Sequence, residues 1–116
     1  MTVIREDDFV QSVADALQFI SYFHPVDYIE HLGRAYEREQ SPAAKDAIAQ
    51  ILTNSRMCAE GHRPICQDTG IVNLFLKVGM DVRWDVQQSL AEMINEGVRR
   101  AYEPVSYTHL TLPTKA

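Results

Sequence analysis

The sequence predicts a mixed α+β fold that is mostly helical, and three observations indicate it. Apolar side chains recur every three or four positions through most of the first 60 residues, as they do in amphipathic helices. A polar loop and a short, branched apolar run then follow, and a run of this kind is typical of a buried strand. A last amphipathic segment closes the pattern. At 116 residues the chain has the length of one compact domain.

The composition is that of an ordinary globular protein, with 46% apolar and 23% charged residues. The net charge is −5, and no cluster of lysine and arginine is present, which argues against a nucleic-acid partner. No apolar run has the length needed to span a bilayer. Acidic residues among the first thirty positions are unlike a signal peptide, so we expect a cytoplasmic protein with no membrane partner.

Residues 8–22 are predicted to form the first helix, with Asp7 or Asp8 as its N-cap. Its apolar stripe consists of Val10, Val13, Ala14, Leu17, Ile20 and Ser21. Pro25 interrupts this pattern and suits the first position of a second helix, because its missing N–H costs nothing there. The inner face expected for the second helix consists of Val26, Ile29, Leu32, Gly33 and Tyr36.

Ser41 and Pro42 predict the start of a third helix, with the serine as N-cap and the proline in the first turn. The helix is expected to run to about Cys58, and Gly61 suits the left-handed residue that closes it. Its apolar stripe consists of Ala44, Ala47, Ile48, Ile51, Leu52, Ser55 and Cys58. We therefore expect Cys58 to fill the core.

Residues 71–78 are predicted to form a mostly buried strand, and residues 82–84 a second short one. Asp85 is expected to cap a last helix that Pro104 stops. The apolar stripe of that helix consists of Val86, Leu90, Met93, Ile94, Gly97, Val98 and Ala101. A glycine there costs about 1 kcal/mol against alanine, so we expect close packing at Gly97.

Residues 105–116 differ from the rest of the chain because they contain no acidic residue. They resemble the translated read-through of a sequencing adaptor. We expect them to be non-native and to lie outside the domain formed by residues 1–104.

The loop of residues 62–70 reads His-Arg-Pro-Ile-Cys-Gln-Asp-Thr-Gly and brings a thiol, an imidazole, a guanidinium, an amide and a carboxylate into nine residues. Pro64 and Gly70 favour a loop backbone over a continued helix or strand. Polar loops between core elements are where catalytic and binding groups usually lie.

Three roles for Cys66 are open. As a nucleophile it would have His62 and Asp68 as partners, although such partners usually come from distant parts of a chain. In a zinc site it would join Cys58 and His62, but a fourth ligand is not evident. As an iron–sulfur ligand it would need two or three further cysteines. The residues alone do not decide among the three.

Residues 63–70, together with Asn-Ser-Arg at 54–56 and Asn-Glu-Gly-Val at 95–98, resemble the N-terminal part of class I fumarate hydratases. This family includes the alpha subunit of tartrate dehydratase. The likeness extends from residue 1 to residue 102 and is stronger to the fumarate hydratase branch.

The resemblance implies a 4Fe–4S cluster with Cys66 as one of three cysteine ligands, the other two being absent from this chain. It also implies that Gln67 and Asp68 contact a small dicarboxylate substrate. No catalytic residue is expected in this stretch. Residues 1–104 would then be an incomplete, N-terminal part of a larger α/β catalytic domain, inactive by itself.

The expected function is that of a hydro-lyase for the reversible hydration of fumarate to malate. One alternative is the alpha subunit of tartrate dehydratase. Another is a non-enzymatic helical binding module in which Cys66 is structural. We expect the complete protein to be a homodimer.

Overall fold

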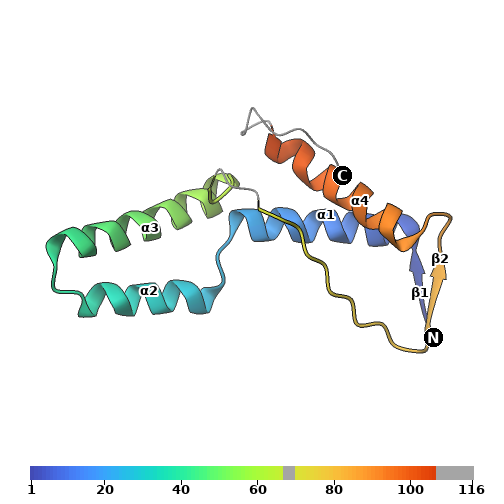
Figure 1. Cartoon of the computed structure of the whole chain (residues 1–116), viewed down its shortest axis with the longest axis horizontal. Coiled ribbons are helices and arrows are strands. Elements are labelled where there is room, and N and C mark those ends of the chain that lie inside the picture. The colour runs from blue at the N-terminus through green and yellow to red at the C-terminus, as the bar shows by residue number, and fades with distance from the viewer. Residues whose placement is uncertain (67–69, 107–116) are drawn as a thin grey trace. The chain divides into compact units, whose positions relative to one another are not determined.

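A computed structural model describes residues 1–66 and 70–106 of the chain. Its elements follow the order β1 (Thr2–Arg5), α1 (Glu6–Tyr22), α2 (Val26–Arg38), α3 (Pro42–Gly61), β2 (Val82–Asp85) and α4 (Leu90–Ser106) (Figure 1). The mostly helical α and β composition confirms the predicted fold class. None of the helices in the described ranges is long and apolar enough to cross a membrane. The chain divides into two compact units. The first consists of Met1–Gln18 and the residues from Gln67 onward, and the second is Phe19–Cys66.

The first unit contains a two-stranded parallel sheet, in which β1 pairs with β2 so that Thr2 lies opposite Val82 and Ile4 opposite Trp84 (Figure 1). The aromatic rings of Phe9 and Trp84 meet edge to face, with centroids 5.4 Å apart. The core of this unit lies between the N-terminal part of α1 and α4. Its buried apolar residues are Val10, Val13, Ala14, Met93 and Ala101.

The ends of the helices in the first unit differ from the predictions. Helix α1 begins at Glu6, so the predicted caps Asp7 and Asp8 lie inside its first turn, where carboxylates favour the positive end of the helix dipole. Asp85 ends β2 and does not cap α4.

Ser89 has that capping position instead, because its hydroxyl oxygen accepts a hydrogen bond from the N–H of Glu92 at 3.2 Å. The predicted stop at Pro104 is also wrong, since α4 continues to Ser106. A proline removes only one N–H, and near the end of a helix the chain can complete its last turn without it.

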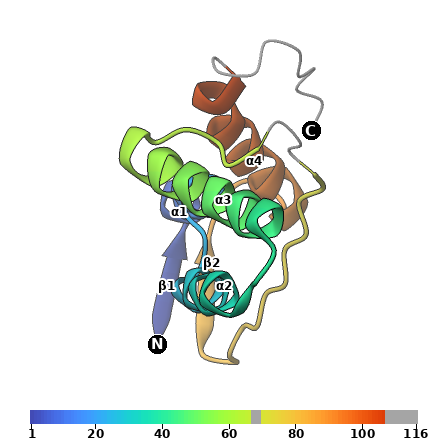
Figure 2. The same ribbon diagram turned by 90° about the vertical axis from the view of Figure 1, so that its left-hand side faces the viewer.

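The second unit is built from α2 and α3, which pack side by side (Figure 2). Lys45 connects them, because its Nζ donates to the carbonyl oxygen of Tyr36 at 2.6 Å and lies 4.0 Å from the centre of that ring. Ser41 is the N-cap of α3, as predicted, and its hydroxyl accepts from the N–H of Ala44 at 3.4 Å. Pro25 is the N-cap of α2, one position earlier than predicted.

The predicted inner face of α2 is only half-buried at Ile29, Leu32 and Gly33, while Val26 is 73% exposed. On α3 the burial is concentrated at Ser55 and Cys58, which confirms the core position predicted for Cys58. Two other members of the predicted stripe, Ala47 and Ile51, are exposed.

The buried strand predicted at residues 71–78 is wrong. This run forms no strand, and most of its side chains are exposed, including 87% of Ile71 and 93% of Phe75. A buried strand needs neighbouring backbone to complete its hydrogen bonds and a surface to cover its side chains. Within the described residues the only strands are β1 and β2, and they pair with each other.

Candidate functional site

The loop that leads to Cys66 starts where α3 ends. His62 is the C-cap of α3 and has a left-handed backbone, with φ 51° and ψ 54°. The N–H groups of His62 and Arg63 both donate to the carbonyl oxygen of Cys58, the second at 3.1 Å. The prediction that Gly61 is the left-handed residue is therefore wrong by one position. Pro64 follows soon after, as is common beyond a helix C-cap.

The imidazole of His62 has an aromatic environment. It is stacked on the ring of Tyr22, with centroids 5.7 Å apart and an interplanar angle of 4°. The ring of Phe23 meets it edge-on at 6.0 Å. These contacts give His62 a structural role at the end of α3.

Three hydrogen bonds hold the backbone just before Cys66. The N–H of Ile65 donates to the carbonyl oxygen of Ser21 at 2.9 Å, and the carbonyl oxygen of Ile65 accepts from Nδ2 of Asn54 at 2.9 Å. The Cys58 thiol lies 3.4 Å from the carbonyl oxygen of Pro64, within range of a weak S–H donor. The loop is therefore anchored to residues of both α1 and α3.

The structure separates the two cysteines by environment. Cys58 is buried, with 6% of its surface exposed, and its thiol lies against Asn54 and Pro64. Cys66 is exposed, at the end of the anchored backbone. Across the part of the chain that the structure describes, no three His, Cys, Asp or Glu side chains are grouped as metal ligands. The zinc site considered for Cys58, His62 and Cys66 is therefore not formed.

The two predicted substrate contacts, Gln67 and Asp68, lie outside the described residues. The same is true of Asp68 as a partner for a nucleophilic cysteine. Of the predicted site residues, the structure thus places Cys66.

Sequence reasoning missed Asn54 as a residue of this loop. Its position was visible as part of the Asn-Ser-Arg segment that carries the family resemblance, one helical turn before Cys58. Its hydrogen bond to Ile65 was not visible, because that contact depends on how the chain folds back after α3.

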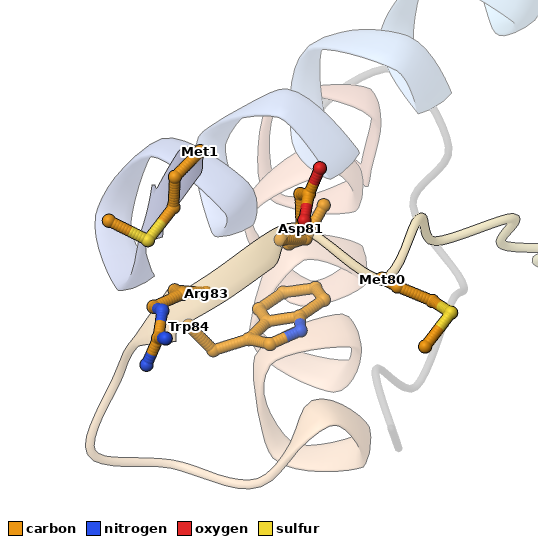
Figure 3. A pocket seen from close by; sticks show the side chains of 6 residues that line it. Met1, Met80, Asp81, Arg83 and Trp84 are labelled. Atoms are coloured by element: carbon orange, nitrogen blue, oxygen red, sulfur yellow. The ribbon is translucent and has the colours of Figure 1, made fainter.

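An open cavity of about 490 Å³ lies in the first unit, away from the predicted site residues in sequence (Figure 3). It is lined by Met1, Met80, Asp81, Val82, Arg83 and Trp84. Met1 and Met80 are almost fully exposed, so they offer little enclosure. Asp81 is its one carboxylate, and the lining contains no group of three metal ligands, so we assign no chemistry to it.

Glu96 on α4 is a carboxylate with a lowered pKa. Hydrogen bonds from Arg99, at 2.7 and 2.9 Å, lower the pKa of Glu96 from 4.5 to about 2, and Arg100 adds to the effect. Arg100 also pairs with Asp7 of α1 at 3.0 Å. A carboxylate that is stabilised in its ionised form within an ion-pair network is typical of a structural role.

Comparison with known proteins gives this arrangement its context. The family described as "Fumarate hydratase (Fumerase)" matches residues 10–110. A protein of Methanocaldococcus jannaschii named "Putative L(+)-tartrate dehydratase subunit alpha" is 32% identical over 93 residues, which are 80% of this chain and 33% of the relative. The L(+)-tartrate dehydratase subunit alpha of Escherichia coli is 29% identical over 89 residues, 77% of this chain and 29% of the relative.

The chain belongs to the fumarate hydratase family, and this confirms the family resemblance predicted from its motifs. The stronger likeness expected to the fumarate hydratase branch is not confirmed, because both relatives described above are named as tartrate dehydratase alpha subunits. It spans about a third of the length of the curated relatives that it matches.

Proposed function

We propose that this chain is part of a hydro-lyase that adds water reversibly to fumarate, forming malate. The observation that carries the proposal is the family match, which runs through the anchored loop and Cys66. A hydro-lyase of this kind acts on a small dicarboxylate. We assign contact with that substrate to Gln67 and Asp68, on the basis of the motif that they share with Cys66.

We further propose that Cys66 is one of three cysteine ligands of a 4Fe–4S cluster. An exposed thiol on an anchored backbone is suited to be one such ligand. The sequence has one other cysteine, the buried Cys58, so a cluster with three cysteine ligands needs thiolates from outside this chain. When bound, an iron without a protein ligand supplies a Lewis acid that polarises the substrate hydroxyl.

Dehydration of L(+)-tartrate is a second candidate function, and the names of the relatives favour it. Fumarate hydration adds water across two adjacent carbons of a four-carbon diacid, and tartrate dehydration removes water from two such carbons. The groups that distinguish these substrates are expected outside this chain.

An activity measurement on the complete protein that carries this sequence tests both candidates. The protein is purified without oxygen, loaded with iron and sulfide, and assayed separately with fumarate, malate and L(+)-tartrate. We expect turnover of one substrate pair, loss of activity in air and recovery on reloading. Full activity in protein stripped of iron would contradict the cluster proposal. No turnover of any of these substrates by the iron-loaded protein would contradict the hydro-lyase proposal and favour the binding-module alternative.

The remaining expectations are proposals of the same kind: a homodimeric complete protein in the cytoplasm, and a non-native origin for residues 105–116. The family match continues to residue 110, which overlaps this tail. Sequencing the encoding genomic DNA past residue 102 tests the tail directly. A genomic sequence identical to the printed one would overturn the adaptor explanation.

A further inference from the structure

The strongest unassigned feature is the bond between Asn54 and the loop before Cys66. Nδ2 of Asn54, on α3, donates to the carbonyl oxygen of Ile65 at 2.9 Å across eleven positions of sequence. Both residues belong to the same compact unit. The bond therefore ties a helix of that unit to the residue next to the proposed ligand.

The position of this hydrogen bond matters because a peptide group is planar. The carbonyl of Ile65 and the N–H and Cα of Cys66 lie in one plane, so a donor on that carbonyl limits rotation of the peptide that begins Cys66. The preceding peptide is held separately, because the Ile65 N–H donates to Ser21 at 2.9 Å. Two consecutive peptide groups are thus fixed by different partners, and the second depends on Asn54.

The Asn54 amide is itself oriented. The carbonyl oxygen of Ile65 can only accept, so the NH₂ group of the amide has to face it. The amide oxygen Oδ1 then faces the buried Cys58 thiol, with a sulfur-to-oxygen distance of 3.6 Å. Asn54 uses both ends of its amide, which an aspartate of the same shape cannot do at neutral pH because it has no donor.

We propose that Asn54 is a positioning residue that fixes the peptide leading into Cys66 and thereby holds the Cys66 thiolate where a metal cluster can use it. The inference rests on the proposed function, in which Cys66 is a cluster ligand. Residues that orient metal ligands without touching the metal change its affinity by about 10- to 100-fold when they are replaced. Asn54 would act in this way through the backbone.

The test replaces Asn54 in the complete protein and follows the loop and the metal separately. Asn54→Asp removes the donor at nearly constant shape. Asn54→Ala removes the donor without adding charge, and it provides the test if the aspartate variant fails to fold. Gln50→Glu is the matched control, because Gln50 is an exposed amide one turn earlier on α3 whose side chain bonds only locally, to Asp46 at 3.0 Å.

Amide hydrogen exchange is measured first, in protein stripped of iron. We expect both Asn54 variants to speed exchange at the amides of Arg63, Ile65 and Cys66 at least several-fold, and Gln50→Glu to leave it unchanged. Exchange as slow as in the wild type would overturn the positioning role, whether or not the protein binds a cluster.

Iron release to a chelator and the electron paramagnetic resonance spectrum of the reduced cluster are measured next. We expect release to be about ten-fold faster in both Asn54 variants, with a shifted or broadened spectrum, and unchanged in the control. A normal release rate and spectrum in the variants would contradict the inference. Failure of the wild type to bind iron would refute the proposed function instead, and would leave the exchange result as the test of Asn54.

Discussion

Gly97 of α4 lies so close to Val13 of α1 that a methyl group at Gly97 would come within 2.7 Å of the Val13 Cβ. The carbonyl oxygen of Val10 would lie 3.0 Å away. The close packing predicted at Gly97 from the sequence is therefore confirmed. It makes this glycine a requirement of the contact between the two helices.

Replacing Gly97 with alanine should destabilise the protein. The added methyl meets the branch point of Val13, which cannot rotate away, and overpacking of this kind costs about 1–3 kcal/mol. The higher helix propensity of alanine returns about 1 kcal/mol. We expect the free energy of unfolding in urea to fall by up to about 2 kcal/mol. Gly33→Ala in α2 is the control: a methyl there has no neighbour within 4 Å, so stability should stay level or rise.

Glu96 should give the protein a defined pH dependence. Its folded pKa of about 2 lies below its ordinary value of 4.5, so the fold stabilises the ionised form. That stabilisation is fully present above pH 4.5 and is lost as the pH falls through 2. Glu96→Gln should therefore lower the melting temperature at pH 7, and the difference from the wild type should close between pH 4.5 and 2.

The measurement is thermal unfolding of iron-free protein at a series of pH values. Glu30→Gln, at an exposed position on α2, is the control and should barely change the melting temperature at pH 7. A difference between the Glu96 variant and the wild type that stays constant down to pH 2 would show that the Arg99 and Arg100 contacts do not stabilise the ionised carboxylate.

We expect Glu6 to stabilise the turn that precedes α4. Its Oε1 accepts from the backbone N–H groups of Gln87 and Gln88, at 2.8 and 2.9 Å. Glu6→Ala leaves both donors without this acceptor and should cost about 1–2 kcal/mol of unfolding free energy. Glu6→Gln keeps an oxygen in the same place and should lose less. Equal losses in the two variants, measured by urea unfolding, would argue against the double hydrogen bond.

We expect His62→Asn to destabilise the protein less than His62→Val. Its left-handed backbone is acceptable to asparagine but costs a branched residue about 1–2 kcal/mol. Both variants lose the stack on Tyr22, which is worth about 0.5–1.5 kcal/mol. Urea unfolding should rank the wild type above His62→Asn, and His62→Asn above His62→Val. The iron content of His62→Asn in the complete protein should match the wild type, and a large loss of iron would return His62 to the list of site residues.

Sequence reasoning succeeded where the cause is local. The Ser41 cap, the break before α2 and the buried side of α3 at Cys58 each follow from a few adjacent residues, and the structure confirms them. The exact ends of helices were less accurate, because Asp7, Asp8 and Asp85 were all chemically suitable caps. A suitable residue does not become a cap unless the backbone turns at that position.

Burial at a distance could not be predicted in the same way. The apolar composition of residues 71–78 indicates a strand that needs a neighbouring strand and a covering surface. The pattern does not say which residues would provide them. The described chain provides none, and Phe75 is 93% exposed. In the site, the identity of Cys66 as the residue of interest came from its motif. The hydrogen bond from Asn54 to Ile65 needed the folded chain, because no periodic pattern relates those two positions.

We propose that Cys66, and not Cys58, is a ligand of the cluster. The most direct measurement is the iron and sulfide content, with the visible absorption spectrum, of the complete protein carrying Cys66→Ser or Cys58→Ser. We expect Cys66→Ser to abolish stoichiometric cluster binding. Cys58→Ser should retain it, since the buried Cys58 thiol lies against Asn54 and the Pro64 carbonyl. A full cluster in Cys66→Ser would contradict the account.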